Sequence, residues 1–350
     1  MDTNRRQFLC GCGIGLLGAV AAPSRARADR LRVLGETTDV DRPVVVASQV
    51  SPEFQRWMRA ARTGHAAGHG GLLVFWLTVK DQAPSLDVAT LDEARKSGAL
   101  LITERDQATV PELIIENRGK GHVLLLAGEI LVGGKQNRVL REDILLPPLS
   151  GPRPIGVYCV EQGRWNEGHK EFESKGSLAQ PGLRSKLMER PDQGRVWDQV
   201  AKAAREAAPA SQSPTGSYQA IYDDSKIKDH TDEIERAAPL RPPALAHGAA
   251  VFAGPSLSGL DLFHSPGLFA REWPKLLRAY AVETYQKMLP RDVPEAKLRA
   301  HVEAVLAQTA RVEGSVRGNA GVGQLFEFRV AGNRGAALLF EGRAIHTAIL

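Results

Sequence analysis

The chain has 350 residues, of which 43% are hydrophobic and 24% are charged, a composition typical of a globular protein with a sizeable core. Its formal charge of +5 is partly due to residues 1–28, which contain four arginines and one aspartate. The remaining residues carry 41 basic and 39 acidic side chains and show no basic stripe. Nucleic-acid binding is therefore not expected.

The first 28 residues have the pattern of an export signal. The pair Arg5-Arg6 precedes an uncharged run over residues 10–23, which is too short to span a bilayer, and Ala26-Arg27-Ala28 forms a cleavage site. The arginine pair and the charges near the cleavage site favour a twin-arginine signal, and a general secretory signal is the alternative. We expect cleavage before Asp29 and a periplasmic or secreted protein without a membrane anchor.

The first half of the chain is predicted to be rich in strands. Short apolar or β-branched runs predict strands at residues 43–50, 72–79, 100–103, 112–117 and 123–127, with spacing that favours antiparallel pairing. Ser51-Pro52 and Thr90 are typical helix starts. The glycine-rich segment 64–71, with His65 and His69, is expected to be a solvated loop rather than a metal site.

The second half alternates helices with strands and loops. We predict a loop-like segment from Trp165 to Arg190 and an amphipathic helix over residues 193–208, with Trp197 in the core. Residues 209–216 are the best linker candidate, and a flexible segment is expected over residues 209–243. Further predictions are strands at 139–146 and 155–160, a hairpin around Gly254-Pro255, helices at 268–288 and 294–312, and strands at 321–330, 336–341 and 345–349.

These elements predict an α+β fold with an antiparallel β-rich core, several amphipathic helices and a C-terminal β-meander. We expect residues 29–290 to form the main domain. Residues 291–350, a helix followed by a three-stranded meander, are expected to pack on that domain.

Polar side chains are concentrated in residues 124–165, between segments that otherwise read as apolar strands. Two glycines, Gly133 and Gly134, precede Lys135, Gln136, Asn137 and Arg138. The spacing does not match a phosphate loop, and no helix follows. Two interpretations remain open: an anion-binding nest of glycine amides beside the cations, or a glycine bulge with solvated cations.

Glu129 lies between apolar strands, where an unpaired carboxylate is costly, so we expect it to have a cationic partner. Arg138 and Arg164 are the obvious candidates. The carboxylate is either part of a structural ion pair or a group that holds a ribose hydroxyl or moves a proton.

The segment Glu161-Gln162-Gly163-Arg164-Trp165 places a carboxylate, an amide, a guanidinium and an indole at the end of a strand. Such groups recur in sites that recognise nucleotides or sugars, and a strand-end ion pair beside a core tryptophan is the structural alternative. We expect this cluster to meet the Glu129 to Arg138 cluster in space.

Cys159 would be the only cysteine after signal cleavage, because the other two lie in the signal. An intramolecular disulfide and a multi-cysteine zinc site would then be excluded, and the sequence indicates no metal site and no particular cofactor. We expect Cys159 to be a buried, inert residue. A thiol nucleophile with His169 or His346 as its base and Glu161 as an acid is the alternative.

The segments AGEILVGGKQNRVL, VYCVEQGRW and DQGRVWDQV resemble the ARG (ADP-ribosylglycohydrolase) and rhodanese-phosphatase-superfamily-associated protein domain family. The resemblance extends from about Leu72 to about Met288. It implies a tie to ADP-ribose or nucleotide metabolism, without defining a reaction. An exported member would be an unusual fit to intracellular nucleotide signalling.

The sequence therefore predicts an exported ligand-binding domain for an anionic, nucleotide- or ADP-ribose-like small molecule. A hydrolase of glycosidic or phosphate bonds with Glu129 or Glu161 as general base is one alternative, and a scaffold with a buried polar network is another. No protein partner is indicated. The expected ligand-binding residues are Lys135, Gln136, Asn137, Arg138, Gln162, Arg164 and Trp165.

Overall fold

The computed structural model describes residues 51–80, 86–105, 111–166, 170–207, 213–285 and 293–350, and the backbone of a strand at residues 45–49. The predicted export signal and His169 lie outside the described residues. The described part has an α+β fold with a strand-rich, largely antiparallel core, which confirms the predicted fold class. Within these ranges, no helix has both the length and the hydropathy that crossing a bilayer requires.

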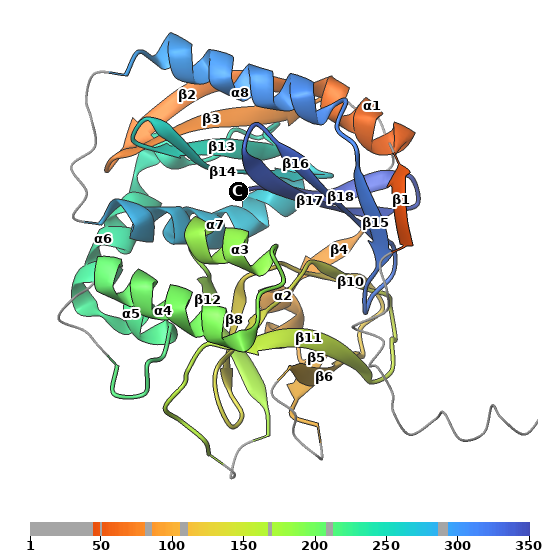
Figure 1. The fold of residues 1–350 in the computed structure, drawn as a ribbon, viewed down its shortest axis with the longest axis vertical. Helices are drawn as coiled ribbons and strands as arrows, with labels where there is room; N and C mark the ends of the chain where they lie inside the picture. The colour runs from red at the N-terminus through yellow and green to blue at the C-terminus, as the bar shows by residue number, and fades with distance from the viewer. Residues whose placement is uncertain are drawn as a thin grey trace, which may run out of the picture. The chain divides into compact units, whose positions relative to one another are not determined.

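A nine-stranded antiparallel sheet forms the larger layer (Figure 1). In spatial order its strands are β1 (Val45–Gln49), β15 (Gly314–Gly318), β16 (Gln324–Val330), β17 (Asn333–Phe340), β18 (Arg343–Ile349), β14 (Ser256–Phe263), β13 (Gly248–Ala253), β3 (Leu72–Val79) and β2 (Ala61–His69). The helices packed on it are α1 (Pro52–Ala60), α8 (Glu295–Thr309) and α7 (Pro266–Thr284).

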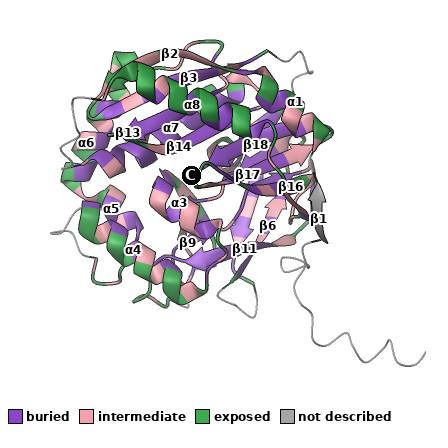
Figure 2. Cartoon of the chain, turned by 45° about the horizontal axis from the view of Figure 1, so that its top comes forward, coloured by how far each residue is buried: buried purple, intermediate pink, exposed green. Residues whose placement is uncertain are grey.

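Strand β3 shows why this sheet is buried on both faces. Its sequence LLVFWLTV is continuously apolar, and successive side chains point to opposite faces. Phe75 and Leu77 join the core beneath α1 and α8, whereas Val74 and Trp76 join the core beneath α7. The Trp76 ring lies 5.2 Å from that of Trp273 on α7. Figure 2 shows the central strands of this sheet buried beneath the exposed outer side of α8.

The site region is built on two smaller sheets. One has the order β10 (Ile144–Leu146), β7 (His122–Leu125) and β4 (Val88–Thr90); the other has the order β12 (Phe172–Leu178), β8 (Glu129–Gly133), β9 (Arg138–Leu140), β11 (Arg153–Cys159), β6 (Glu112–Asn117) and β5 (Leu100–Thr103). Only the β4–β7 pair is parallel among the strand pairs of the described residues. The six-stranded sheet separates two further hydrophobic clusters.

Helices cover the six-stranded sheet and connect it to α7. They are α2 (Leu91–Lys96), α3 (Pro181–Leu187), α4 (Gln193–Ala207), α5 (Gln219–Asp223) and α6 (Ser225–Arg236). The 3₁₀ turn η3 (Ala238–Leu240) follows α6 and packs on β2 of the larger sheet. The predicted start of α2 is confirmed, because Thr90 and Glu93 form a reciprocal capping box. Ser51 likewise caps α1.

Two predicted loops are wrong. Residues 61–69 form β2, which pairs antiparallel with β3, so tertiary pairing outweighs the poor strand propensity of its glycines. The segment after Trp165 contains β12 and α3, because β12 pairs with β8 through Phe172 and Gly133. β2 and β3 form a hairpin around Gly70-Gly71, so this pairing is local and was missed because the glycines of the segment predict a loop. The partner of β12 lies about 40 residues earlier in the chain, so local sequence does not indicate that pairing.

The segment that the sequence predicts to be flexible, residues 209–243, contains α5, α6 and η3 in its described part. Residues 209–212 lie outside the described residues. In the C-terminal part, the predicted meander is present as β16, β17 and β18. These strands continue the sheet that contains β3 and β13, so residues 314–349 share a sheet with the earlier part of the chain.

Candidate functional site

The two polar segments predicted to meet do contact each other, through the guanidinium of Arg164. Its Nε donates to Glu161 Oε2 at 2.7 Å, and its Nη2 donates to Asn137 Oδ1 at 2.9 Å. Nη1 and Nη2 also donate to the carbonyl oxygens of Gly134 and Gly133, at 3.0 and 3.1 Å. The turn after β11 is thereby attached to the turn between β8 and β9.

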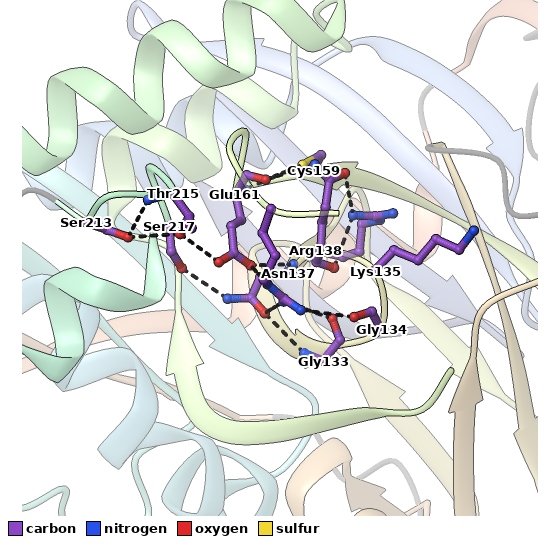
Figure 3. Close-up of polar contacts among 12 residues, drawn as sticks. Gly133, Gly134, Lys135, Asn137, Arg138, Cys159, Glu161, Ser213, Thr215 and Ser217 are labelled. Carbon is purple, nitrogen blue, oxygen red and sulfur yellow. Dashed lines mark hydrogen bonds and ion pairs between the residues drawn. The ribbon is translucent and has the colours of Figure 1, made fainter. Parts of the chain in front are cut away.

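The carboxylate of Glu161 lies at the centre of this contact and is 5% exposed (Figure 3). Besides Arg164, its Oε2 accepts a hydrogen bond from the main-chain amide of Asn137 at 3.1 Å. Its Oε1 accepts one from the Thr215 hydroxyl at 2.8 Å. Both oxygens are therefore engaged by the protein itself.

A third segment, residues 213–217, completes the cluster. The amide of Gly163 donates to the Thr215 carbonyl at 2.8 Å, and Asn137 Nδ2 donates to Ser217 Oγ at 3.0 Å. Ser217 also forms an isolated β-bridge with Glu161. Thr215 and Ser217 were not predicted as site residues, because their only local signal is a hydroxyl-rich stretch that is also typical of a linker.

Gly133 and Gly134 allow the backbone to approach neighbouring atoms closely. Gly133 has φ 132° and Gly134 has φ 48°. A Cβ on Gly133 would lie 2.4 Å from the Glu171 carbonyl oxygen, and one on Gly134 would lie 2.2 Å from a ring carbon of Phe172. Only glycine fits both positions.

The amides of this turn bind groups of the protein itself. Those of Gly133, Gly134 and Lys135 donate to Asn137 Oδ1, to the Glu171 carbonyl and to Glu104 Oε1. The two glycine carbonyls face a cation, the Arg164 guanidinium. Of the two open interpretations, the structure favours the glycine bulge over the anion-binding nest.

Arg138 is completely buried. Its Nη1 donates to the main-chain and side-chain oxygens of Gln136 at 3.1 and 3.3 Å, and Nη2 lies 3.6 Å from Glu104 Oε1. Burial lowers the pKa of this guanidinium, and the nearby Glu104 carboxylate opposes the shift. Gln136 is itself 6% exposed and donates to the Glu161 carbonyl at 3.0 Å. Arg138, Gln136 and Asn137 therefore line the interior and not an open pocket.

Cys159 is buried, as predicted. Its Sγ donates to the Glu161 carbonyl at 3.3 Å, and its backbone exchanges hydrogen bonds with the Gln193 side chain at 2.8 and 2.9 Å. The nitrogens of His346 bind Asp143 and Asp261, so this histidine is not a base for the thiol. The proposed pairing of Cys159 with His346 is therefore wrong, and His169 lies outside the described residues.

Lys135 and Trp165 are the groups of the motif that face outward. The Lys135 ammonium lies 4.8 Å from the centroid of the Trp165 ring, which is 49% exposed. Gln162 is also exposed, and the Arg164 side chain is 27% exposed. We call Lys135, Gln162, Arg164 and Trp165 the outer face of the motif.

Glu129 does not join this cluster. Its partner is Lys275 on α7, and not Arg138 or Arg164 as predicted from the sequence. The same ammonium lies 3.0 Å from Glu272 Oε2 and 3.0 Å from Asp92 Oδ2. Burial raises the pKa of Glu129 to about 8, although Lys275 opposes the shift, and burial also raises the pKa of Glu272. The Lys275 ammonium thus interacts with three carboxyl groups, and two of them, those of Glu129 and Glu272, are buried.

The model of the ARG and Rhodanese-Phosphatase-superfamily-associated Protein (ARPP-1) domain matches residues 60–350. The chain belongs to this family. No curated protein and no solved structure matched the chain. The match confirms the resemblance and extends beyond residues 72–288 on both sides.

A second buried charge network in the ARPP-1 domain is centred on Asp261 of β14. Its carboxylate accepts two hydrogen bonds from Arg184, one at 3.1 Å from His346 Nε2 and one at 2.5 Å from the Tyr280 hydroxyl. His346 Nδ1 lies 2.7 Å from Asp143 Oδ2. These interactions together lower the pKa of Asp261 despite its burial. Burial would lower the pKa of His346, but the two carboxylates outweigh it and raise the pKa to about 9.

Neither buried network has the arrangement of an open catalytic centre. Glu129 is 1% exposed and its Oε2 accepts a hydrogen bond from the Leu126 amide, while its Oε1 pairs with Lys275. Across the ranges described above, no cluster of three or more His, Cys, Asp or Glu side chains is placed to hold a metal ion. The two networks join α7 and α3 to the sheets, and they were not predicted because their members lie far apart in sequence.

The charge on His346 should make the stability of the ARPP-1 domain depend on pH. An unfolded histidine titrates near pH 6.5 and folded His346 near 9, so the stabilisation is complete below pH 6.5 and is lost as the pH rises through 9. This shift in the pKa of His346 corresponds to at most about 3 kcal/mol in the free energy of unfolding. The raised pKa of Glu129 also makes the folded state less stable as the pH rises from 4.5 to about 8.

Urea unfolding between pH 6 and 9.5 measures this effect. We expect the free energy of unfolding of the wild type to fall across this range. His346→Gln should be less stable at pH 6.5 and should lose less stability as the pH rises, whereas His301→Gln, at an exposed position on α8, should follow the wild type. A wild-type profile that is flat from pH 6.5 to 9 would show that His346 is not held protonated.

Proposed function

We propose that this protein is an exported binding domain for an anionic small molecule, and that the ligand is nucleotide- or ADP-ribose-like. The observation that carries the proposal is the Lys135–Trp165 pair, an ammonium above a half-exposed indole ring. An aromatic plane beside a cation matches a ligand that has both a base and a phosphate.

The charges of the motif support an anionic ligand. The network contains three cations, Lys135, Arg138 and Arg164, and two carboxylates, Glu104 and Glu161. Both arginines are held by carbonyl and carboxylate oxygens, so the remaining positive charge is that of Lys135 at the surface. An incoming phosphate would meet this ammonium without first breaking a buried ion pair.

Trp165 would provide the stacking surface. Stacking of a base on an aromatic side chain is worth about 1–3 kcal/mol. Gln162 has an exposed side chain in the same turn, and its amide could bind polar edges of a base or ribose. Gln136, Asn137 and Arg138, which we expected to touch the ligand, would instead hold the turn that carries Trp165, because they are buried.

The hydrolase alternative is less well supported by this geometry. A general base needs a free lone pair within reach of a water molecule. Both carboxylate oxygens of Glu161 accept hydrogen bonds, and Glu129 is buried in an ion pair with Lys275. Glu161 is 5% exposed and Glu129 is 1% exposed, so either carboxylate would have to become accessible before it could activate a water molecule.

The ARPP-1 family suggests which ligands to test, and the export signal suggests how the protein leaves the cytoplasm. The family name refers to ADP-ribosylglycohydrolase, which makes ADP-ribose and its fragments the first ligands to test. The arginine pair and the Ala-x-Ala site support export in a folded state.

Replacing Arg5 and Arg6 by lysines should therefore retain the unprocessed protein in the cytoplasm, as measured by cell fractionation and by the mass of the product. Normal export of that variant would contradict the twin-arginine route.

Isothermal titration calorimetry with ADP-ribose, ADP, AMP and inorganic phosphate tests the binding proposal. We expect Lys135→Ala to weaken binding of the phosphorylated ligands about tenfold, because it removes the free surface cation of the network. Trp165→Ala should weaken ADP-ribose, ADP and AMP similarly and leave phosphate unaffected, because phosphate has no base to stack.

The matched controls are Lys120→Ala and Leu245→Ala, which remove an exposed cation and an exposed apolar side chain elsewhere. Both should bind as the wild type does. If Lys135→Ala and Trp165→Ala bind the phosphorylated ligands as tightly as the wild type, the outer face is not the binding site. If the wild type binds none of these ligands, the proposal of a nucleotide-like ligand is wrong.

A further inference from the structure

A separate pocket lies between α4, α5 and the loop that ends at Ser217. Its volume is about 170 Å³. Val200, Ala204 and Ile221 form much of its apolar wall, and Gln162 and Ser217 lie at its motif side. It is smaller than the roughly 300 Å³ at which pockets for drug-sized ligands begin, so it fits a compact molecule and not a whole nucleotide.

Two polar groups that line the α4–α5 pocket are without partners among the described residues. The indole Nε1 of Trp197 is buried and has no hydrogen-bond acceptor there. The guanidinium of Arg205, on the same helix, forms neither a hydrogen bond nor an ion pair with any residue in the described ranges. The Arg205 guanidinium is exposed and therefore accessible to a ligand, whereas the Trp197 nitrogen is closed to solvent.

The pocket is held in shape by the motif. Ser217 Oγ accepts a hydrogen bond from Asn137 Nδ2, so its own hydroxyl hydrogen remains available to a ligand. The next residue, Tyr218, donates its amide to the Val160 carbonyl at 2.8 Å. Figure 3 shows Ser213, Thr215 and Ser217 on one side of the network and the Lys135 side chain extending away on the other. The Lys135 side chain therefore extends away from the pocket, and Gln162 is a residue that the pocket and the outer face share.

We propose that the α4–α5 pocket binds a compact organic acid with an apolar body. The carboxylate pairs with Arg205, whose planar guanidinium offers two parallel hydrogen bonds, and the body packs against Val200, Ala204 and Ile221. The Ser217 hydroxyl donates to a ligand oxygen at the motif side of the pocket. This site does not depend on the nucleotide-like ligand of the outer face.

Fluorine NMR with 4-fluorobenzoate and its neutral analogue 4-fluorobenzyl alcohol tests this proposal on the mature protein. The wild type should bind the acid more tightly than the alcohol. Arg205→Ala should lower the affinity for the acid at least tenfold, to that of the alcohol. Arg195→Ala, which removes an exposed arginine on α4 outside the pocket lining, should have no effect.

Two substitutions that fill the pocket complete the test. Ala204→Phe should abolish binding of both probes, and Ala201→Phe, at a more exposed position of the lining, should do the same if Ala204→Phe does not fold. Wild-type affinity for 4-fluorobenzoate in Arg205→Ala, or binding that survives a filled pocket, would overturn the proposal. So would a wild type that binds neither probe or that does not prefer the acid.

Discussion

The carboxylate of Glu161 is the point at which three segments distant in the chain are held together. It binds the Asn137 amide, the Arg164 guanidinium and the Thr215 hydroxyl, and it is nearly inaccessible to solvent. Removing one partner of such a buried pair leaves the other charge without compensation, which typically costs about 3–5 kcal/mol. The positions of the outer face and of the α4–α5 pocket both depend on this carboxylate, because it binds Arg164, next to Trp165, and Thr215, two residues before Ser217.

This arrangement separates the structural role of the motif from its binding role. Two arginines with carboxylate and carbonyl partners form the interior of the motif, in which Nε and Nη2 of Arg138 have no hydrogen-bond partner among the described residues. Lys135 and Trp165 lie on one side of this interior, and the apolar pocket with Arg205 lies on the other. A buried polar network of this kind is compatible with the scaffold alternative, since most of its groups bind other parts of the protein. The exposed Trp165 indole and the Arg205 guanidinium, which has no partner among the described residues, carry the two binding proposals.

The elements with strong local patterns could be predicted from the sequence, and long-range partners could not. The apolar run of β3, the cap of α2 and the burial of Cys159 follow from local composition. The convergence of the two polar clusters was also predictable, because each lies at the end of a strand. The partner of Glu129 was predicted wrongly, since Lys275 is 146 residues away on a helix whose acidic and basic residues look like an ordinary solvated face. Thr215 was missed for a similar reason: a hydroxyl in a linker-like stretch acquires its role only through contact with Glu161.

Amide hydrogen exchange of the wild type and Glu161→Gln tests most directly whether this carboxylate holds the three segments together. A glutamine at this position would place an NH₂ group against donors that now face carboxylate oxygens. The amides of Asn137, Gly163 and Tyr218 should exchange slowly in the wild type and should become faster together in the variant, while amides in β3 remain protected. If Gly163 and Tyr218 exchange at the same rate in both proteins, the segments are held by other contacts and Glu161 is not their common anchor.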